Sequence, residues 1–225
     1  MKKIVSLFFV IAAVSNLYSQ SLEEIVRRQA QALKEDNYNN IQTLKITGSI
    51  NQMGMALGMT NYYKAPDKSK VVISFSGQEI IQVFDGTKGY MINPMAGNTP
   101  QELPADQADN LKNNSSYKSP LTRYLAEKKL TLEGTENVND KPAFKIKAVD
   151  GANTIYFFID KSTWLPVRTS LVSGGMTVDT YQEWAEIKGL MLPKTSKTKS
   201  GVMEIIMTIE NAEVNIPLEE SFFKI

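Results

Sequence analysis

Apolar residues recur at every second position through most of this chain, and that spacing restricts its fold more than any other feature. The pattern is clearest near the C-terminus, where Met203, Ile205, Met207 and Ile209 alternate with mostly polar residues. Successive side chains of a β-strand point to opposite faces of the sheet, so the pattern is typical of strands with one dry face and one wet face. Segments of this kind, separated by turn signals such as Ser173-Gly174-Gly175, predict about 11 antiparallel strands.

Two segments depart from the spacing of two. Residues 21–34 have apolar residues at helical spacing behind a plausible N-cap, Ser21. Residues 94–128 interrupt the strands for about 35 positions, which is too long for a hairpin loop. Within them, 105–113 and 120–128 predict two short helices, and the whole segment is either a covering element or a mobile lid that exchanges its amide hydrogens faster than the strands do.

The predicted fold class is therefore mainly β (α+β). A long, strongly twisted antiparallel meander curls into a barrel or half-barrel. The alternation therefore predicts a barrel or half-barrel of about 11 strands, accompanied by about three helices. The 225-residue chain has an ordinary globular composition, with 42% hydrophobic and 22% charged residues, and residues 20–225 suit a single domain.

The first 19 residues have the three regions of a cleavable signal peptide. Lys2 and Lys3 precede an apolar run from Ile4 to Val14, and a polar stretch ends at Ser19. The run is shorter than the roughly 20 residues that a membrane-spanning helix needs. We expect an exported, periplasmic protein that does not span the membrane and is monomeric, and a retained N-terminal anchor remains the alternative.

The composition excludes several kinds of function. The chain contains no His and no Cys, so it can form neither a Ser-His nor a Cys-His catalytic pair and no standard zinc site. A net charge of +1 argues against a nucleic-acid partner, which requires a concentrated cationic surface. No spaced acidic loop predicts a calcium site. We expect no cofactor and no metal.

Carboxylates leave one enzymatic alternative open, a hydrolase that acts on envelope glycan or lipid. Asp85, Asp150 and Asp160 each end a predicted strand beside a turn. Aspartate in such a place commonly accepts hydrogen bonds from the backbone of its own turn. We therefore predict structural roles for all three, and we expect no catalytic residue.

Methionine is unusually placed among the apolar residues, since six of the ten methionines fall on predicted strands or hairpin flanks. Methionine is flexible and lines surfaces that accept ligands of variable shape, although it also fills irregular cores. A curved sheet that three short helices cover incompletely would leave an apolar cavity able to receive an acyl chain. The candidate cavity residues are Met53, Met55, Met59, Ile73, Phe75, Ile81, Val83, Met91, Ile155, Phe157, Met176, Val178, Met203, Ile205 and Met207.

Four segments carry a family resemblance, namely Tyr62–Lys68, Phe84–Pro94, Ile159–Arg168 and Pro217–Phe223. In this order they resemble the bacterial outer-membrane lipoprotein carrier (LolA/LolB-like) superfamily, in particular its lipoprotein-sorting-protein-like branch. The resemblance implies that the barrel is unclosed: we expect an antiparallel half-barrel of about 11 strands, with about three helices covering its concave face. It also implies a protein that carries or senses the acyl chains of lipoproteins or lipids in the periplasm.

Two hypotheses follow from the resemblance. The first is a carrier that sequesters an acyl chain and takes part in lipoprotein sorting to the outer membrane, with Lys64 and Lys68 near the barrel mouth available to anionic head groups. The second is a sensor or interaction module that docks an envelope protein without transport. Both predict a binding protein and not an enzyme.

Overall fold

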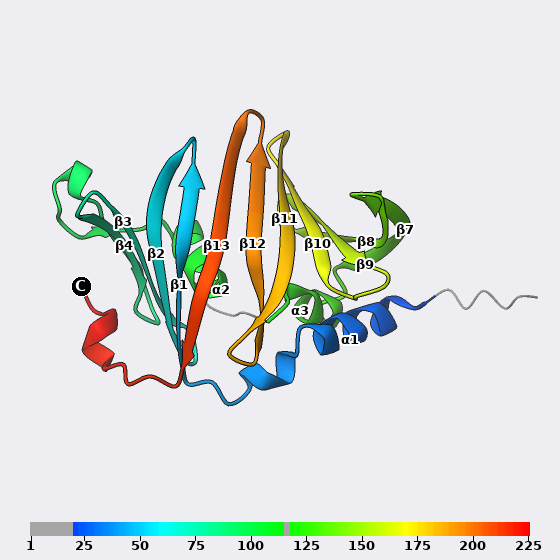
Figure 1. Cartoon of the computed structure of the whole chain (residues 1–225), viewed down its shortest axis with the longest axis horizontal. Coiled ribbons are helices and arrows are strands. Elements are labelled where there is room, and N and C mark those ends of the chain that lie inside the picture. Colours follow the sequence, from blue (N-terminus) through cyan, green and yellow to red (C-terminus); the bar gives the residue numbers. More distant parts are fainter. Residues whose placement is uncertain (1–19, 115–117) are drawn as a thin grey trace, which may run out of the picture.

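The computed structural model describes residues 20–114 and 118–225, and the predicted signal peptide lies outside them. The described chain forms one antiparallel sheet of 13 strands in the order β6-β5-β4-β3-β2-β1-β13-β12-β11-β10-β9-β8-β7 (Figure 1). The predicted class is confirmed: the sheet is curved and unclosed, with β6 at one edge and β7 at the other. The strand number exceeds the expected 11.

The strands follow the alternating segments of the sequence closely. Their bounds are β1 (Thr43–Gln52), β2 (Met55–Lys64), β3 (Lys68–Phe75), β4 (Gln78–Phe84), β5 (Gly89–Ile92), β6 (Gln101–Glu102), β7 (Leu130–Val138), β8 (Lys141–Asp150), β9 (Asn153–Asp160), β10 (Pro166–Ser173), β11 (Met176–Ile187), β12 (Leu190–Ser200) and β13 (Met203–Val214). The two-residue β6 is too short to show a period, which explains why the sequence did not predict it.

Two meanders make up the sheet, and one long-range pairing joins them. Strands β1 to β6 form the first meander and β7 to β13 the second, so that β1 pairs with β13 at the centre. The register of this pair shifts between Thr47 and Gly48. A Cβ atom on Gly48 would lie 2.0 Å from the backbone oxygen of Thr208, so the close approach of the two strands requires glycine there.

The three predicted helices are all present: α1 (Leu22–Ala32), α2 (Ala105–Asn114) and α3 (Pro120–Ala126). Ser21 caps α1 as expected, because its Oγ accepts a hydrogen bond of 3.2 Å from the backbone N–H of Glu24. Ser119 caps α3 in the same way, and Pro120 occupies the first turn. Three short 3-10 helices complete the fold: η1 (Glu35–Tyr38), η2 (Pro94–Ala96) and η3 (Glu220–Phe223).

All three α-helices lie on one face of the sheet, which we call the inner face. Ile25 of α1 and Leu121 of α3 are fully buried against Ile146 and Phe157 of β8 and β9. At the other edge α2 covers β5, where a Cβ on Gly89 would lie only 2.8 Å from the Cβ of Ala108. The expectation that helices cover the concave face is confirmed. They cover its two flanks, with the inner face of the central strands between them.

The outer face is also covered, at one side, by the C-terminal segment. The ring of Phe222 in η3 meets the ring of Tyr62 edge-on at 4.8 Å between centroids. Nζ of Lys70 lies 4.2 Å from the centroid of the Phe222 ring. Phe223 beside it is buried. The C-terminus therefore packs on the side of the sheet opposite to the α-helices.

Candidate functional site

The register of the sheet determines which residues face the helices. Directly paired residues of neighbouring strands share a face, so the inner face can be followed outward from Phe157, which lies beneath α1 and α3. One continuous row across seven strands runs Phe157, Thr169, Thr180, Thr198, Ile205, Gln52 and Met55. Residues two positions along any of these strands belong to the same face.

Twelve of the fifteen candidate cavity residues lie on this inner face. They are Met55, Met59, Ile73, Phe75, Met91, Ile155, Phe157, Met176, Val178, Met203, Ile205 and Met207. The three others lie elsewhere. Ile81 and Val83 pair with Val72 and Lys70, which places both on the outer face, and Met53 lies in the turn between β1 and β2.

The pattern of β4 explains the position of Ile81 and Val83. The strand reads Gln78-Glu79-Ile80-Ile81-Gln82-Val83-Phe84, with apolar residues at both alternations, so its sequence does not indicate which set faces inward. The C-terminal η3 packs against the neighbouring β3 on this outer face, and Val83 is fully buried.

An uncovered apolar strip occupies the centre of the inner face, between α2 on one side and α1 with α3 on the other. Ile205 and Met207 of β13 pair with β1, and Ile50 of β1 pairs with Leu57 of β2. These four side chains are all partly exposed, and so is Ile73 of β3. By contrast, Phe157 under the helices is 6% exposed. The strip is therefore apolar surface that the described chain leaves open.

A cavity of about 910 Å³ adjoins this face between α2 and α3. Its lining includes the apolar residues Ile155 of β9 and Leu171 of β10 together with charged residues such as Lys118, Arg123 and Asp150. Ligand pockets commonly have volumes of about 300–1,000 Å³. The volume and the mixed lining suit a ligand with an apolar part and a polar part.

Sequence reasoning missed the polar half of the inner face. Thr169, Thr180 and Thr198 lie side by side on β10, β11 and β12, and the hydroxyls of Thr180 and Thr198 are 3.1 Å apart. Ser196 is buried on the same face, two positions from Thr198. Threonine is common on the wet faces of strands, so only the register could show that these hydroxyls point inward. The inner face is thus apolar over β1–β3 and β13 and hydroxyl-rich over β10–β12.

The three strand-end aspartates make structural contacts. Oδ1 of Asp85 accepts hydrogen bonds from the backbone N–H groups of Thr87 and Lys88 at 2.7 and 2.8 Å. Oδ1 of Asp160 accepts from the backbone N–H groups of Ser162 and Thr163, both at 2.8 Å, and from their hydroxyls. The turn roles predicted for these two residues are confirmed.

Asp150 departs from that prediction, because its side chain binds a residue of α3 and Lys129, three positions beyond the end of that helix. The hydroxyl of Tyr124 donates to Oδ2 at 3.1 Å, and Nζ of Lys129 donates to Oδ1 at 2.8 Å. The hydrogen bond from Lys129 holds the pKa of Asp150 below its usual range. This contact connects α3 to the β8–β9 hairpin.

Burial by itself would raise the pKa of Asp160. The hydrogen bonds from Ser162 and Thr163 outweigh that effect, so the pKa of Asp160 lies below its ordinary value.

Lys64 and Lys68 hold the C-terminal segment on the outer face. Nζ of Lys64 lies 2.7 Å from a carboxylate oxygen of Glu220, and Nζ of Lys68 contacts the other oxygen. Hydrogen bonds from the two ammonium groups lower the pKa of Glu220 to about 2. Nζ of Lys64 also donates to the backbone oxygen of Leu218 at 2.8 Å. Both lysines thus have partners within the chain and lie outside the inner face.

Two further features bear on the class of protein. Among residues 20–114 and 118–225, no three His, Cys, Asp or Glu side chains are grouped as metal ligands would be. No helix of that same part of the chain combines the length and the apolar character that crossing a membrane requires.

No family model matches this sequence, and no curated protein matches it either. Several solved structures do match it in fold. A domain described as an outer membrane lipoprotein-sorting protein, from Vibrio parahaemolyticus, superimposes with a TM-score of 0.63 at 9% identity over 91% of this chain and 97% of that one. A LolA superfamily protein from Nitrosomonas europaea gives a TM-score of 0.62 at 12% identity over 88% and 97%. The chain has a LolA-like fold.

A DUF1329 family protein from Desulfovibrio piger extends the likeness, with a TM-score of 0.59 at 13% identity over 89% of this chain and 97% of that one. The match spans nearly the whole of each LolA-like structure. At identities of 9–13% the resemblance concerns the backbone fold. The resemblance expected from the sequence segments is confirmed at that level.

Proposed function

We propose that this LolA-like protein is a periplasmic carrier that shelters an acyl chain of a lipid or lipoprotein against its inner face. The observation that carries the proposal is the apolar strip of β13, β1, β2 and β3, which the helices leave uncovered. The similarity to a domain described as a lipoprotein-sorting protein supports the same class of cargo. Binding of this kind requires no catalytic group.

The size of the hydrophobic contribution suits such a task. Each methylene moved from water to apolar surroundings contributes about 0.8 kcal/mol. A chain of about 12 carbons would gain on the order of 10 kcal/mol before the cost of ordering it is subtracted. That gain is enough to hold a chain reversibly.

The hydroxyl-rich half of the inner face suits the polar part of the same ligand. Thr169, Thr180 and Thr198 lie in one row with Ile205, so a chain lying on the apolar strip brings its ester or amide group within reach of hydroxyls. Hydroxyl groups can donate to a carbonyl oxygen and accept from an N–H. The cargo class is therefore an amphiphile with an acyl chain.

Uptake of a fluorescent fatty acid by delipidated protein tests the proposal. Met207→Lys places an ammonium group in the middle of the strip and should abolish uptake while the circular dichroism spectrum and the melting temperature remain close to wild type. Ile206→Lys is the matched control, because this neighbouring residue is also partly exposed but faces the opposite side. It should retain uptake.

Failure of the wild-type protein to bind any acyl ligand would reject the carrier. Native mass spectrometry of protein taken directly from the periplasm then separates the alternatives. A bound lipid agrees with the carrier, whereas a stoichiometric protein partner on a lipid-free chain would favour the sensor or interaction module.

A further inference from the structure

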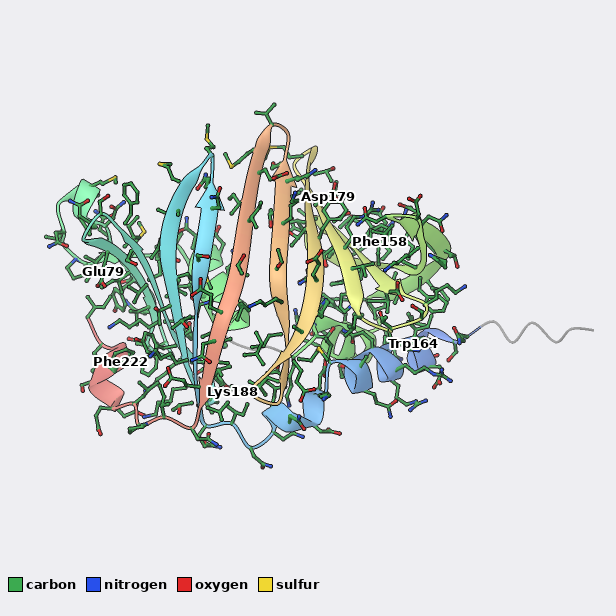
Figure 2. The ribbon with its side chains drawn as sticks, viewed as in Figure 1. Glu79, Phe158, Trp164, Asp179, Lys188 and Phe222 are labelled. Atoms are coloured by element: carbon green, nitrogen blue, oxygen red, sulfur yellow. The ribbon has the colours of Figure 1, made fainter. Side chains whose placement is uncertain are left out.

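One end of the sheet carries an unusual set of hairpin tips. The β1–β2, β3–β4, β10–β11 and β12–β13 turns all lie at this end, because the strands alternate in direction. Figure 1 shows the β1–β2, β10–β11 and β12–β13 tips along its upper edge and the β3–β4 hairpin at its left side, and in Figure 2 yellow sulfur atoms of methionine side chains lie near the upper edge. We call these four turns and their flanking apolar residues the apolar rim: Met53, Met55, Phe75, Met176, Val202 and Met203.

The side chains of the apolar rim are among the most exposed apolar groups of the described chain. Val202 is fully exposed, Met53 is 83% exposed and Met176 is 68% exposed. Met55, Met203 and Phe75 are 49%, 46% and 42% exposed. Single exposed apolar residues are ordinary on protein surfaces, but their collection at one end marks an interaction site.

The turns at the opposite end provide an internal comparison. Every one of the five turns there carries at least one charged residue: Asp67, Asp85, Asp140, Lys161 and Lys188. The tips of the apolar rim read Met-Gly, Ser-Gly, Gly-Gly and Gly-Val and carry none. The fifth turn at the rim end, between β8 and β9, follows Asp150 and belongs to the flank that α3 covers. The four central tips are therefore uncharged, whereas every turn at the opposite end carries a charge. The β8–β9 turn and the β5–β6 connection (93–100) are uncharged as well, but they lie toward the two edges of the sheet, outside the apolar rim.

The spacing of the tips favours a soft, extended partner. Adjacent tips are two strands apart, which corresponds to roughly 10 Å, so the four tips span about 30 Å. A rigid protein partner would need a separate pocket for each protruding tip. A lipid surface deforms around each one and accepts apolar side chains that enter its interfacial region.

The apolar rim is also continuous with the inner face. Met55, Phe75, Met176 and Met203 belong to it by register. Met55, Phe75 and Met203 lie on strands of the apolar strip, whereas Met176 of β11 leads toward the hydroxyl-rich half. From Met203 the path continues through Ile205 to Met207. An acyl chain that leaves a lipid layer at the apolar rim would remain in contact with apolar side chains along the whole path.

We propose that the apolar rim docks on the surface of a phospholipid bilayer and brings the open end of the inner face against it. The inference that an acyl chain enters and leaves the protein at this end rests on the proposed carrier function, whereas the docking itself does not. Because the tips have no charge, docking depends on the apolar side chains and requires neither anionic lipid nor low salt.

Partitioning onto vesicles tests this proposal with the mature chain. We expect co-sedimentation with phosphatidylcholine vesicles, and an affinity within about threefold for vesicles containing phosphatidylglycerol. Val202→Ser should weaken partitioning about tenfold, and the triple variant Met53→Ser, Met176→Ser, Val202→Ser more than a hundredfold. Each substitution removes most of an apolar side chain that the bilayer would bury.

Val214→Ser is the matched control for Val202→Ser, because Val214 is also exposed but lies at the opposite end of β13. It should bind vesicles as the wild type does. A fluorescent label can confirm the geometry, since the chain has no cysteine of its own. An environment-sensitive dye on Val202→Cys should shift to the blue when vesicles are added, and the same dye on Lys188→Cys at the opposite end should not.

Three outcomes would overturn the proposal: equal partitioning of the triple variant and the wild type, binding only to anionic vesicles with loss in salt, and self-association through the apolar rim without vesicle binding. The last would identify a second copy of the chain as the partner. Fatty-acid uptake is measured without vesicles and is independent of these results. A protein that takes up ligand but ignores vesicles rejects the docking alone, and one that binds vesicles but takes up nothing rejects the carrier alone.

Discussion

Replacement of Gln29 by leucine should stabilise this protein, although the residue lies at the centre of α1. Gln29 is 0% exposed, and neither atom of its side-chain amide has a hydrogen-bond partner among the described residues. It lies one helical turn from Ile25 and one from Leu33, both buried, so it belongs to the packed side of the helix. A polar group in this position has lost its bonds to water and gained none in return.

The magnitude follows from that loss. A buried polar group without a partner costs about 1–3 kcal/mol, and leucine has nearly the same length and a good helix propensity. We expect Gln29→Leu to raise the free energy of unfolding by about 2 kcal/mol. For a chain of this size each 1 kcal/mol corresponds to about 2–4 °C, so the melting temperature should rise by roughly 4–8 °C.

Thermal and urea unfolding followed by circular dichroism measure the change. Gln31→Leu is the matched control, because it makes the same substitution at an exposed position of the same helix and should change the unfolding free energy by less than about 0.5 kcal/mol. A Gln29→Leu variant that is no more stable than wild type, or less stable, would show that the amide is satisfied in solution and would refute the reasoning.

Two further predictions concern stability. Gly48→Ala should destabilise the protein by about 2–3 kcal/mol, because the new Cβ meets the rigid backbone oxygen of Thr208. Gly58→Ala should cost less, because its new Cβ meets the side chain of Ser74, which can rotate. Comparable losses of unfolding free energy in urea for the two variants would contradict this reasoning. Asp160→Ala should lose roughly 3 kcal/mol at pH 7 through its hydrogen bonds. The folded-state pKa of Asp160 is depressed, so its contribution is complete above the unfolded pKa of about 3.9 and disappears as the pH falls through the folded value. The stability difference between wild type and Asp160→Ala should therefore shrink below about pH 4, and a difference that is constant down to pH 2 would contradict the assignment.

Local sequence signals predicted most of the fold because they act within single elements. The spacing of two predicted about 11 of the 13 strands, and the sequence placed α2 and α3 within two residues of their observed ends. Ser21 was identified as the cap of α1 for the same reason, since a capping bond joins residues three positions apart.

The candidate site was predicted less completely, because it depends on pairings between distant segments. Alternation groups the residues of one strand into two sets but does not say which set faces the helices. At β13 one set is clearly apolar, so Ile205 and Met207 could be assigned to the inner face. At β4 both sets are apolar, and Ile81 and Val83 lie on the outer face.

The sequence by itself determined that this chain forms a curved antiparallel sheet with three helices, and that methionine-rich strands line part of it. The tertiary structure decided where those strands meet. Pairing of β1 with β13 brings Leu57 and Met207 from distant parts of the chain to one strip, and pairing of β10, β11 and β12 places three threonines on the same inner face. It also collects four uncharged tips at one end of the sheet. The physical reason is that periodicity is a local property of the backbone, whereas register is set by hydrogen bonds between strands far apart in sequence.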